Sequence, residues 1–156
     1  MRIVFVVVAA LLAAAAQAEV LVTFDKPERY ADIGRRAPER MKDLEEFFKR
    51  MGTEYLPAGE TVRIDILDID LAGEPRYGSA SSSDDTRVLQ GRIDHPSVRL
   101  RYVLESGGME IDRREETIAD KNYLERPIKQ PESLAYEKRM LERWFRDRFG
   151  KDAKRR

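Results

Sequence analysis

The pattern of apolar and polar residues between Val62 and Glu74 predicts a central β-strand whose alternation changes phase halfway along. Up to Ile66 the apolar residues occupy even-numbered positions, whereas from Leu67 onwards they occupy odd-numbered ones. Side chains alternate between the two faces of a strand, so a regular strand would bury aspartates at a cost on the order of a few kcal/mol each. One extra residue at Ile66 and Leu67, a β-bulge, restores a single apolar face. This bulge turns four apolar side chains inward, Val62, Ile64, Ile69 and Leu71, and four charged ones outward, Arg63, Asp65, Asp68 and Asp70.

Two stretches show the three- and four-residue spacing of amphipathic helices. The first runs from Pro38 to Met51, because proline is tolerated at a first helical position and Gly52 is the expected stop. The second runs from Glu132 to Phe149 and ends before Gly150. Each helix has one apolar side, which needs a sheet to cover.

A short apolar strand from Val20 to Phe24 precedes the first helix, so strand, helix and central strand form a crossover unit with parallel strands. Two more strands follow the central one. We predict an α+β fold: a mixed sheet of about four strands with the two amphipathic helices packed mainly on one face. A long polar loop from Pro75 to Asp85 and an irregular stretch from Asp120 to Gln130, anchored by Tyr123 and Leu124, complete the connections.

The third and fourth strands form a predicted hairpin around the Gly107-Gly108 turn. Val98 to Leu104 alternates apolar and polar residues, as a half-buried strand does. Met109 to Ile118 carries five consecutive charged residues and is therefore expected at the sheet edge. Counting back from the turn predicts three cross-strand pairs: Leu104 with Ile111, Arg99 with Glu116, and Glu105 with Glu110.

The first eighteen residues have the features of an export signal. Arg2 precedes an unbroken apolar run from Ile3 to Ala16, which is too short to span a membrane, and Ala16-Gln17-Ala18 has the small-x-small pattern of a cleavage site. The mature product is expected to be soluble and periplasmic or secreted, with no transmembrane segment. We expect three parts: a cleaved signal peptide at 1–18, one globular domain at 19–150 and a disordered basic tail at 151–156.

The amino-acid composition excludes several kinds of site. The absence of cysteine excludes disulfides and a lipid-anchored lipoprotein, and a single histidine, His95, excludes a multi-histidine zinc site. The 29 basic and 29 acidic residues cancel, so net charge selects no partner. Lys138 to Arg156 is nevertheless basic, and Glu60 to Glu74 is acidic apart from Arg63. Such complementary stretches lie near each other or form solvated faces.

The acidic end of the central strand is the sharpest candidate site. Asp68 and Asp70 start about 7 Å apart on one strand face, and with Glu74 they are candidate ligands for calcium or magnesium. Alternatively, they accept backbone or arginine hydrogen bonds and fix the turn at Gly73. The same carboxylates meet the spacing of a glycosidase acid and base pair, a criterion that surface acids often satisfy by accident. No organic cofactor is expected.

The basic face of the last helix, with the tail, is a second candidate site of a different class. An anionic envelope surface, such as lipid phosphate, would gain about 1 kcal/mol from each nearby basic residue. Solubility is the simpler explanation of these charges, and nucleic acid is not expected because interleaved exposed aromatic residues are missing. The candidate residues are Arg139, Arg143, Arg146, Lys151 and Lys154.

Several runs of residues also match a known family. They are Tyr55-Leu56-Pro57, Asp68 to Pro75, Asn122-Tyr123-Leu124, and Tyr136 to Leu141 followed by Trp144-Phe145. Through them the chain resembles a family of signal-bearing proteins of Gram-negative bacteria, domain of unknown function 3016, over essentially the whole mature chain. The resemblance implies a periplasmic or secreted bacterial protein, and it implies no activity, ligand or catalytic residue.

We therefore expect a non-catalytic binding or interaction protein of the bacterial envelope. Its partner is an envelope protein or an anionic envelope surface, and the sequence does not identify it. A divalent-cation binder is the first alternative, and a hydrolase with paired carboxylates is the second.

Overall fold

A computed structural model describes residues 17–75, 87–129, 132–151 and 153 of the protein. Most of the expected signal peptide, most of the long polar loop, and Lys154 lie outside these residues, so the predictions made for them stay predictions. The elements are β1 (Glu19–Phe24), η1 (Pro27–Arg29), α1 (Ala37–Tyr55), β2 (Glu60–Asp70), β3 (Glu74–Pro75), β4 (Arg87–Val88), β5 (Ser97–Ser106), β6 (Met109–Ala119), η2 (Tyr123–Glu125) and α2 (Ala135–Phe149).

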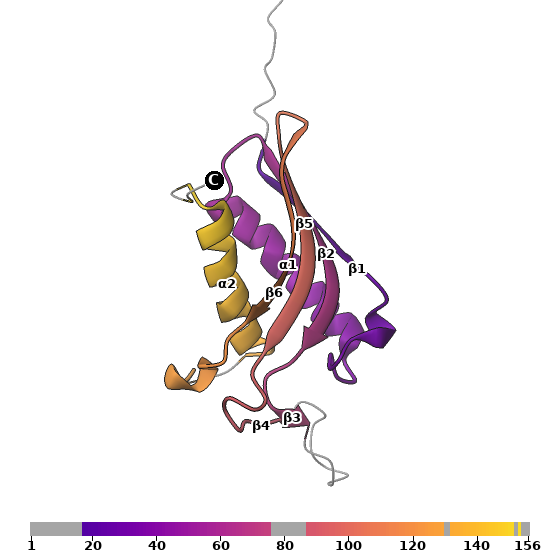
Figure 1. The fold of residues 1–156 in the computed structure, drawn as a ribbon, viewed down its shortest axis with the longest axis vertical. Helices are drawn as coiled ribbons and strands as arrows, with labels where there is room; N and C mark the ends of the chain where they lie inside the picture. Colours follow the sequence, from indigo (N-terminus) through magenta and orange to yellow (C-terminus); the bar gives the residue numbers. More distant parts are fainter. Residues whose placement is uncertain (1–16, 76–86, 130–131, 152, 154–156) are drawn as a thin grey trace, which may run out of the picture.

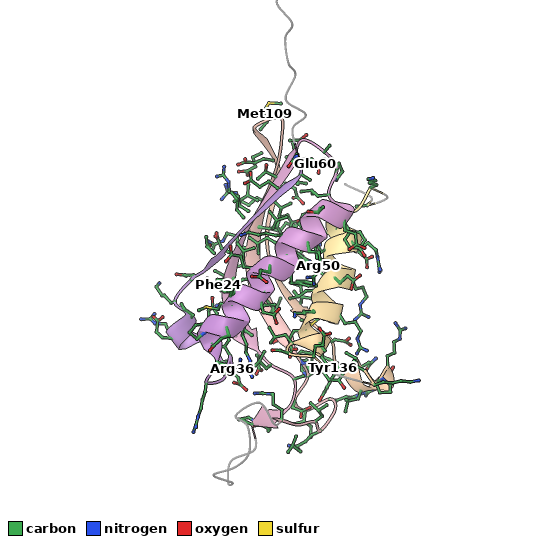
Figure 2. The ribbon with its side chains drawn as sticks, turned by 180° about the vertical axis from the view of Figure 1, so that it is seen from behind. Phe24, Arg36, Arg50, Glu60, Met109 and Tyr136 are labelled. Atoms are coloured by element: carbon green, nitrogen blue, oxygen red, sulfur yellow. The ribbon has the colours of Figure 1, made fainter. Side chains whose placement is uncertain are left out.

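The four long strands form one mixed sheet in the order β1-β2-β5-β6 (Figure 1). β1 is parallel to β2, with α1 between them in sequence, and the other neighbours are antiparallel. The short strands β3 and β4 pair separately as a two-stranded ribbon. Figure 2, drawn from the opposite side, shows α1 and α2 together in front of the sheet. The α+β fold, the opening crossover unit and the edge position of the fourth strand are confirmed.

The bulge predicted in β2 is present. Ile66 pairs with Leu100 and Asp68 pairs with Arg99, which leaves Leu67 as the extra residue. The inward apolar side chains on both sides of the bulge are buried. The Ile66 carbonyl accepts hydrogen bonds from a backbone N–H and a tyrosine hydroxyl of the connection that follows β1. The bulge therefore keeps one continuous apolar face under the helices.

Aromatic side chains from α1, β5 and α2 fill the core. Tyr102 and Phe149 meet edge to face with ring centroids 5.0 Å apart, and Phe48 lies 6.4 Å from Phe145. Such pairs contribute ~0.5–1.5 kcal/mol beyond the burial of their area. Trp144 packs against the same cluster and donates its indole N–H to a carboxylate of β6 at 2.8 Å. The apolar sides predicted for both helices are thus core.

The first helix is longer than predicted, because Gly52 does not end it. α1 continues to Tyr55, and Gly52 lies inside its last turns, buried against β1. A Cβ atom at Gly52 would lie 2.4 Å from Cγ2 of Val20, too close for any side chain. Glycine is therefore required here for close packing of helix on strand and not as a stop.

The second helix starts three residues later than predicted. α2 begins at Ala135, because Leu134 has a left-handed backbone with φ of 59°. A non-glycine residue in that conformation cannot continue a right-handed helix. The end of the helix at Phe149, before Gly150, is as predicted.

The register of the β5–β6 hairpin was predicted incorrectly by one residue. Glu105 does pair with Glu110, but Leu104 pairs with Asp112 because Ile111 is an extra, bulged residue. Beyond the bulge every pair shifts, so that Arg99 faces a threonine of β6 and not Glu116. The shift brings the Asp112 carboxylate within 2.7 Å of the Tyr102 hydroxyl, which donates a hydrogen bond to it.

Of the two anchors predicted for the irregular stretch after β6, only Tyr123 is confirmed. Tyr123 is fully buried, its ring meets that of Tyr136 edge to face at 5.0 Å, and its hydroxyl donates to Asp94 at 2.8 Å. Leu124, the second predicted anchor, is exposed.

Candidate functional site

Both helices begin at the same end of the molecule, because the sheet topology requires it. α1 connects the parallel strands β1 and β2, so it runs against them and starts near their carboxyl ends. Two antiparallel steps make β6 parallel to β2, so α2, which follows β6, starts at that end too. Figure 2 labels Arg36 and Tyr136, at the starts of α1 and α2, at the end opposite Glu60. The positive ends of two helix dipoles therefore lie together.

A pocket of about 380 Å³ lies at this end. It is bounded by the first turn of α1, the end of β2, the start of α2, and Arg87 and Leu89 in and after β4. We call it the Arg87 pocket. It is lined by Arg40, Leu71, Ala72, Arg87, Leu89, Glu132, Ser133, Leu134, Ala135, Tyr136 and Glu137.

Arg87 joins the ribbon to the end of β2. Its Nε donates to the carbonyl of Ala72 at 2.7 Å, and its Nη2 donates to the carbonyl of Gly73 and to the carboxylate of Asp32. The side chain is 13% exposed. A guanidinium held by several acceptors has little freedom to move, so its position in the pocket wall is fixed.

Glu137 is the buried carboxylate of the pocket. It lies in the first turn of α2, where the helix dipole favours a negative charge, and its Oε1 accepts a hydrogen bond from the backbone N–H of Ala72 at 2.7 Å. Burial raises the pKa of this carboxyl, while hydrogen bonds from the N–H groups of Ala72 and Glu137 itself, and the charges of Arg87 and Arg40, oppose the shift. The residue ties the start of α2 to the end of β2.

Arg40 projects from the first turn of α1 into the same region. It is buried, and its Nη1 donates to the carbonyl of Ile33 at 2.6 Å. A Cβ atom at Gly34 would overlap the guanidinium, and the positive φ of 70° at Gly34 also favours glycine. Glycine at position 34 thus leaves room for the guanidinium group of Arg40 beside the start of α1.

The pocket wall combines charged and apolar residues. Two arginines, Arg40 and Arg87, and two glutamates, Glu132 and Glu137, line it, and the two helix starts add positive potential. Leucine, alanine and tyrosine side chains also line it, and Leu89 is 38% exposed. Such an arrangement suits a small molecule with an apolar body and an anionic group.

The structure does not bring the predicted metal ligands together. The Asp68 carboxylate accepts a hydrogen bond from the backbone N–H of Ala31 at 2.8 Å, and Glu74 lies in the separate ribbon. Burial raises the pKa of Asp70, and the nearby charges of Asp32 and Asp68 raise it further. Across the described part of the chain, no three His, Asp or Glu side chains are grouped so as to hold a metal ion. Asp68 thus accepts a backbone hydrogen bond, as in the alternative interpretation, but from the connection after β1 and not from the turn at Gly73.

The predicted anionic-surface residues lie along α2, and their charges are partly engaged. Arg139 donates to the backbone carbonyls of Tyr123 and Arg126, Arg143 to Asp120 at 2.8 Å, and Arg146 to the neighbouring Asp147. These arginines border a groove of about 320 Å³ that also contains three carboxylates. Lys151 is exposed, and Lys154 is outside the described residues. The groove therefore carries both signs of charge.

Two basic side chains of the α2 region pair with carboxylates outside the acidic central strand. Arg143 bonds Asp120, and Arg148 bonds Glu116 of β6.

Sequence reasoning did not identify Arg40, Arg87 or Glu137. Arg87 follows a polar loop, and a glutamate in a first helical turn is ordinary, so neither position stands out in a pattern. One signal was present: Ala72 and Glu137 lie in two of the runs on which the family resemblance rests, and these runs, 65 positions apart, meet through one hydrogen bond.

Comparisons with known proteins agree with that resemblance. The family model described as protein of unknown function (DUF3016) matches residues 18–147. A crystal structure of a Xanthomonas campestris protein of the DUF330 family is similar at 14% identity, covering 88% of this chain and 86% of that chain with a TM-score of 0.33. No curated protein matches significantly. Within residues 17–75, 87–129, 132–151 and 153, no helix has the length and apolar character needed to cross a membrane.

Proposed function

The chain belongs to the DUF3016 family, whose function is unknown, and we propose from its pocket that it is a non-catalytic binding protein of the bacterial envelope. The ligand occupies the Arg87 pocket. One observation carries the proposal: two of the runs on which the family resemblance rests, around Ala72 and Glu137, meet in the wall of this pocket.

Export supports the envelope location. The sequence begins with one basic residue, an apolar run and a small-x-small site that ends at Ala18. The first strand begins at Glu19, the residue that cleavage would leave as the new N-terminus. Among the described residues, the sheet therefore begins directly after the expected cleavage site.

The pocket chemistry favours a small amphipathic anion as ligand. Two arginines and two helix N-termini favour a carboxylate or phosphate group, Glu132 in the lining is exposed and therefore screened by solvent, and the apolar lining residues favour a short hydrocarbon body. Glu137 is already engaged by Ala72, so its negative charge is partly compensated.

The charged side chains of the pocket are fixed by hydrogen bonds, which supports ligand binding rather than catalysis. Arg87 is fixed by carbonyl groups and Asp32, Glu137 by the Ala72 N–H, and Arg40 by the Ile33 carbonyl. General acid or base catalysis needs a side chain free to exchange a proton with substrate. Charges fixed in this way position a ligand instead.

Titration calorimetry with octanoate tests the proposal. Leu89→Glu places a negative charge on the apolar wall, and Ile93→Glu is the matched control at an 85% exposed position outside the pocket. Octanoate is expected to bind the wild type and the control equally, and Leu89→Glu about tenfold or more weakly, equivalent to at least about 1.4 kcal/mol. Octyltrimethylammonium, with the same body and opposite charge, should not bind. Absence of octanoate binding, or equal binding by Leu89→Glu, would contradict the proposal.

A further inference from the structure

β1 is an open edge of the sheet. Among the described strands it pairs with β2 alone, and it forms the outer edge in Figure 1. An edge strand presents backbone N–H and C=O groups that a further strand can bond.

The phase of the β1–β2 ladder shows which groups point outward. The N–H of Asp25 donates to the Ile66 carbonyl at 2.9 Å, so Asp25 directs its N–H toward β2. In a parallel ladder alternate residues of one strand bond the same neighbour. Leu21 and Thr23 therefore also bond β2, whereas the backbone groups of the three intervening residues point away from the sheet. Those residues are Val20, Val22 and Phe24.

β1 lacks the sequence features that hinder strand pairing at the other edge of the sheet, β6. β6 carries consecutive charges from Asp112 to Glu116 and a bulge at Ile111. Val20 to Phe24 contains neither charge nor proline, and its pairing with β2 has no register shift. Soluble proteins usually block a regular apolar edge, so an unblocked one marks a contact site.

Apolar side chains beside this edge are only partly covered. Val22, Phe24 and Met41 of α1 pack against the core while remaining partly accessible, and Leu21 on the opposite face is 41% exposed. A strand added to β1 would place alternate side chains over Val22, Phe24 and Met41. The added strand therefore needs apolar residues at alternate positions.

Charge decides between a second copy of this chain and another protein. Carboxylates lie at both ends of the edge, at Glu19 and Asp25. Antiparallel pairing of two copies centred on Val22 would set Glu19 of one copy opposite Asp25 of the other, and like charges directly opposite are destabilising. Lysine or arginine at the ends of an added strand would instead be attracted.

We propose that β1 binds an extended segment of another protein by strand addition, with alternating apolar residues and a basic residue at each end. Such pairing draws affinity from main-chain hydrogen bonds and specificity from alternate side chains.

The test uses a synthetic peptide, Lys-Val-Thr-Val-Thr-Val-Lys, and two variants of Val22. Val22→Pro removes an outward N–H without removing a β1–β2 hydrogen bond, and Val22→Ala trims the side chain but keeps the N–H. The peptide should bind the wild type in a saturable way and should bind Val22→Pro at least about tenfold more weakly than Val22→Ala, because the outward N–H is retained in the alanine variant and lost in the proline variant. A peptide with glutamate at both ends should also bind at least about tenfold more weakly.

Amide hydrogen exchange gives an independent readout. Peptide binding should slow exchange at Val20, Val22 and Phe24 and leave Leu21 and Thr23 unchanged, because only the first three point outward. Lack of saturable binding, equal binding by Val22→Pro, or slowing at Leu21 instead would overturn the proposal. A wild-type dimer in sedimentation that Val22→Pro abolishes would show that the occupant is a second copy.

Discussion

Glu137 shows how one side chain joins structure to the site. Its carboxylate is buried, accepts the Ala72 N–H and forms part of the pocket wall. Loss of this acceptor would leave a buried N–H unsatisfied, at a cost of about 1–3 kcal/mol. Glutamine retains an oxygen acceptor of similar reach while removing the buried charge.

Glu137→Gln should therefore destabilise the protein less than Glu137→Ala. The stability of Glu137→Gln relative to the wild type should also depend on pH. The pKa of the folded carboxyl is raised, mainly by burial, so the folded state holds its proton at a pH where the unfolded chain has released it. The contribution of this group to the free energy of unfolding therefore falls as pH rises from the ordinary value of 4.5 through the raised value. Glutamine does not titrate, so its stability relative to wild type should increase over that interval.

Urea unfolding of the wild type and of Glu137→Gln at a series of pH values from acid to neutral measures this difference in unfolding free energy. The raised pKa of Asp70 acts in the same direction in both proteins and cancels in the comparison. A difference in unfolding free energy that does not vary with pH would show that burial of the Glu137 charge has no energetic consequence.

At the scale of single residues, the sequence predicted which side chains are buried better than it predicted what each residue does. The inward residues of β2 were assigned correctly because burying aspartate is costly. Gly52 was misassigned, since a glycine required by close contact with Val20 looks the same in sequence as a helix stop. Only the packing of α1 on β1 separates the two explanations.

At the scale of elements, the two bulges show when a pattern is sufficient. In β2 the apolar residues lie directly on both sides of the phase change, so the extra residue at Leu67 could be located. In β6 the apolar residues Ile111 and Ile118 also differ in phase, but only charged residues and a threonine separate them. The bulge at Ile111 therefore left no position-specific signal, and the predicted register slipped by one.

Changing the length of β2 tests the function of its bulge. Deletion of Leu67 leaves an uninterrupted alternation with the same inward residues, so the protein should fold with a modest loss of stability. Insertion of one alanine after Leu67 should abolish folding, because the alanine takes the place of Ile69 opposite Val98 and moves Ile69 and Leu71 beyond their core positions, losing about 1.5–3 kcal/mol for each apolar side chain exposed.

Circular dichroism during thermal unfolding compares the two length variants. Cooperative unfolding of the deletion variant and its absence in the insertion variant are expected. Equal loss of folding in both would mean that the bulge itself, rather than the alternation it restores, is needed.

At the scale of the whole molecule, the pocket follows from topology. Strand directions place both helix starts at one end, and three segments far apart in sequence supply Arg40, Arg87 and Glu137 there. The fold class, both helices and the edge position of the charged strand β6 could be predicted because each depends on a local pattern. The pocket could not, because its residues become neighbours only after the chain has folded, and in the acidic strand end that stood out in sequence the Asp68 carboxylate is engaged by the Ala31 N–H.

Mapping octanoate on the protein by the chemical shifts of backbone amides is the most direct test of the central claim, that ligand binds in the Arg87 pocket. The amides of Ala72, Leu89 and Glu137 should shift in a saturable way, and those of Gly107 and Gly108, in the hairpin turn outside the pocket, should not. Shifts confined to the groove along Arg139 to Arg146, or no saturable shifts, would contradict the account.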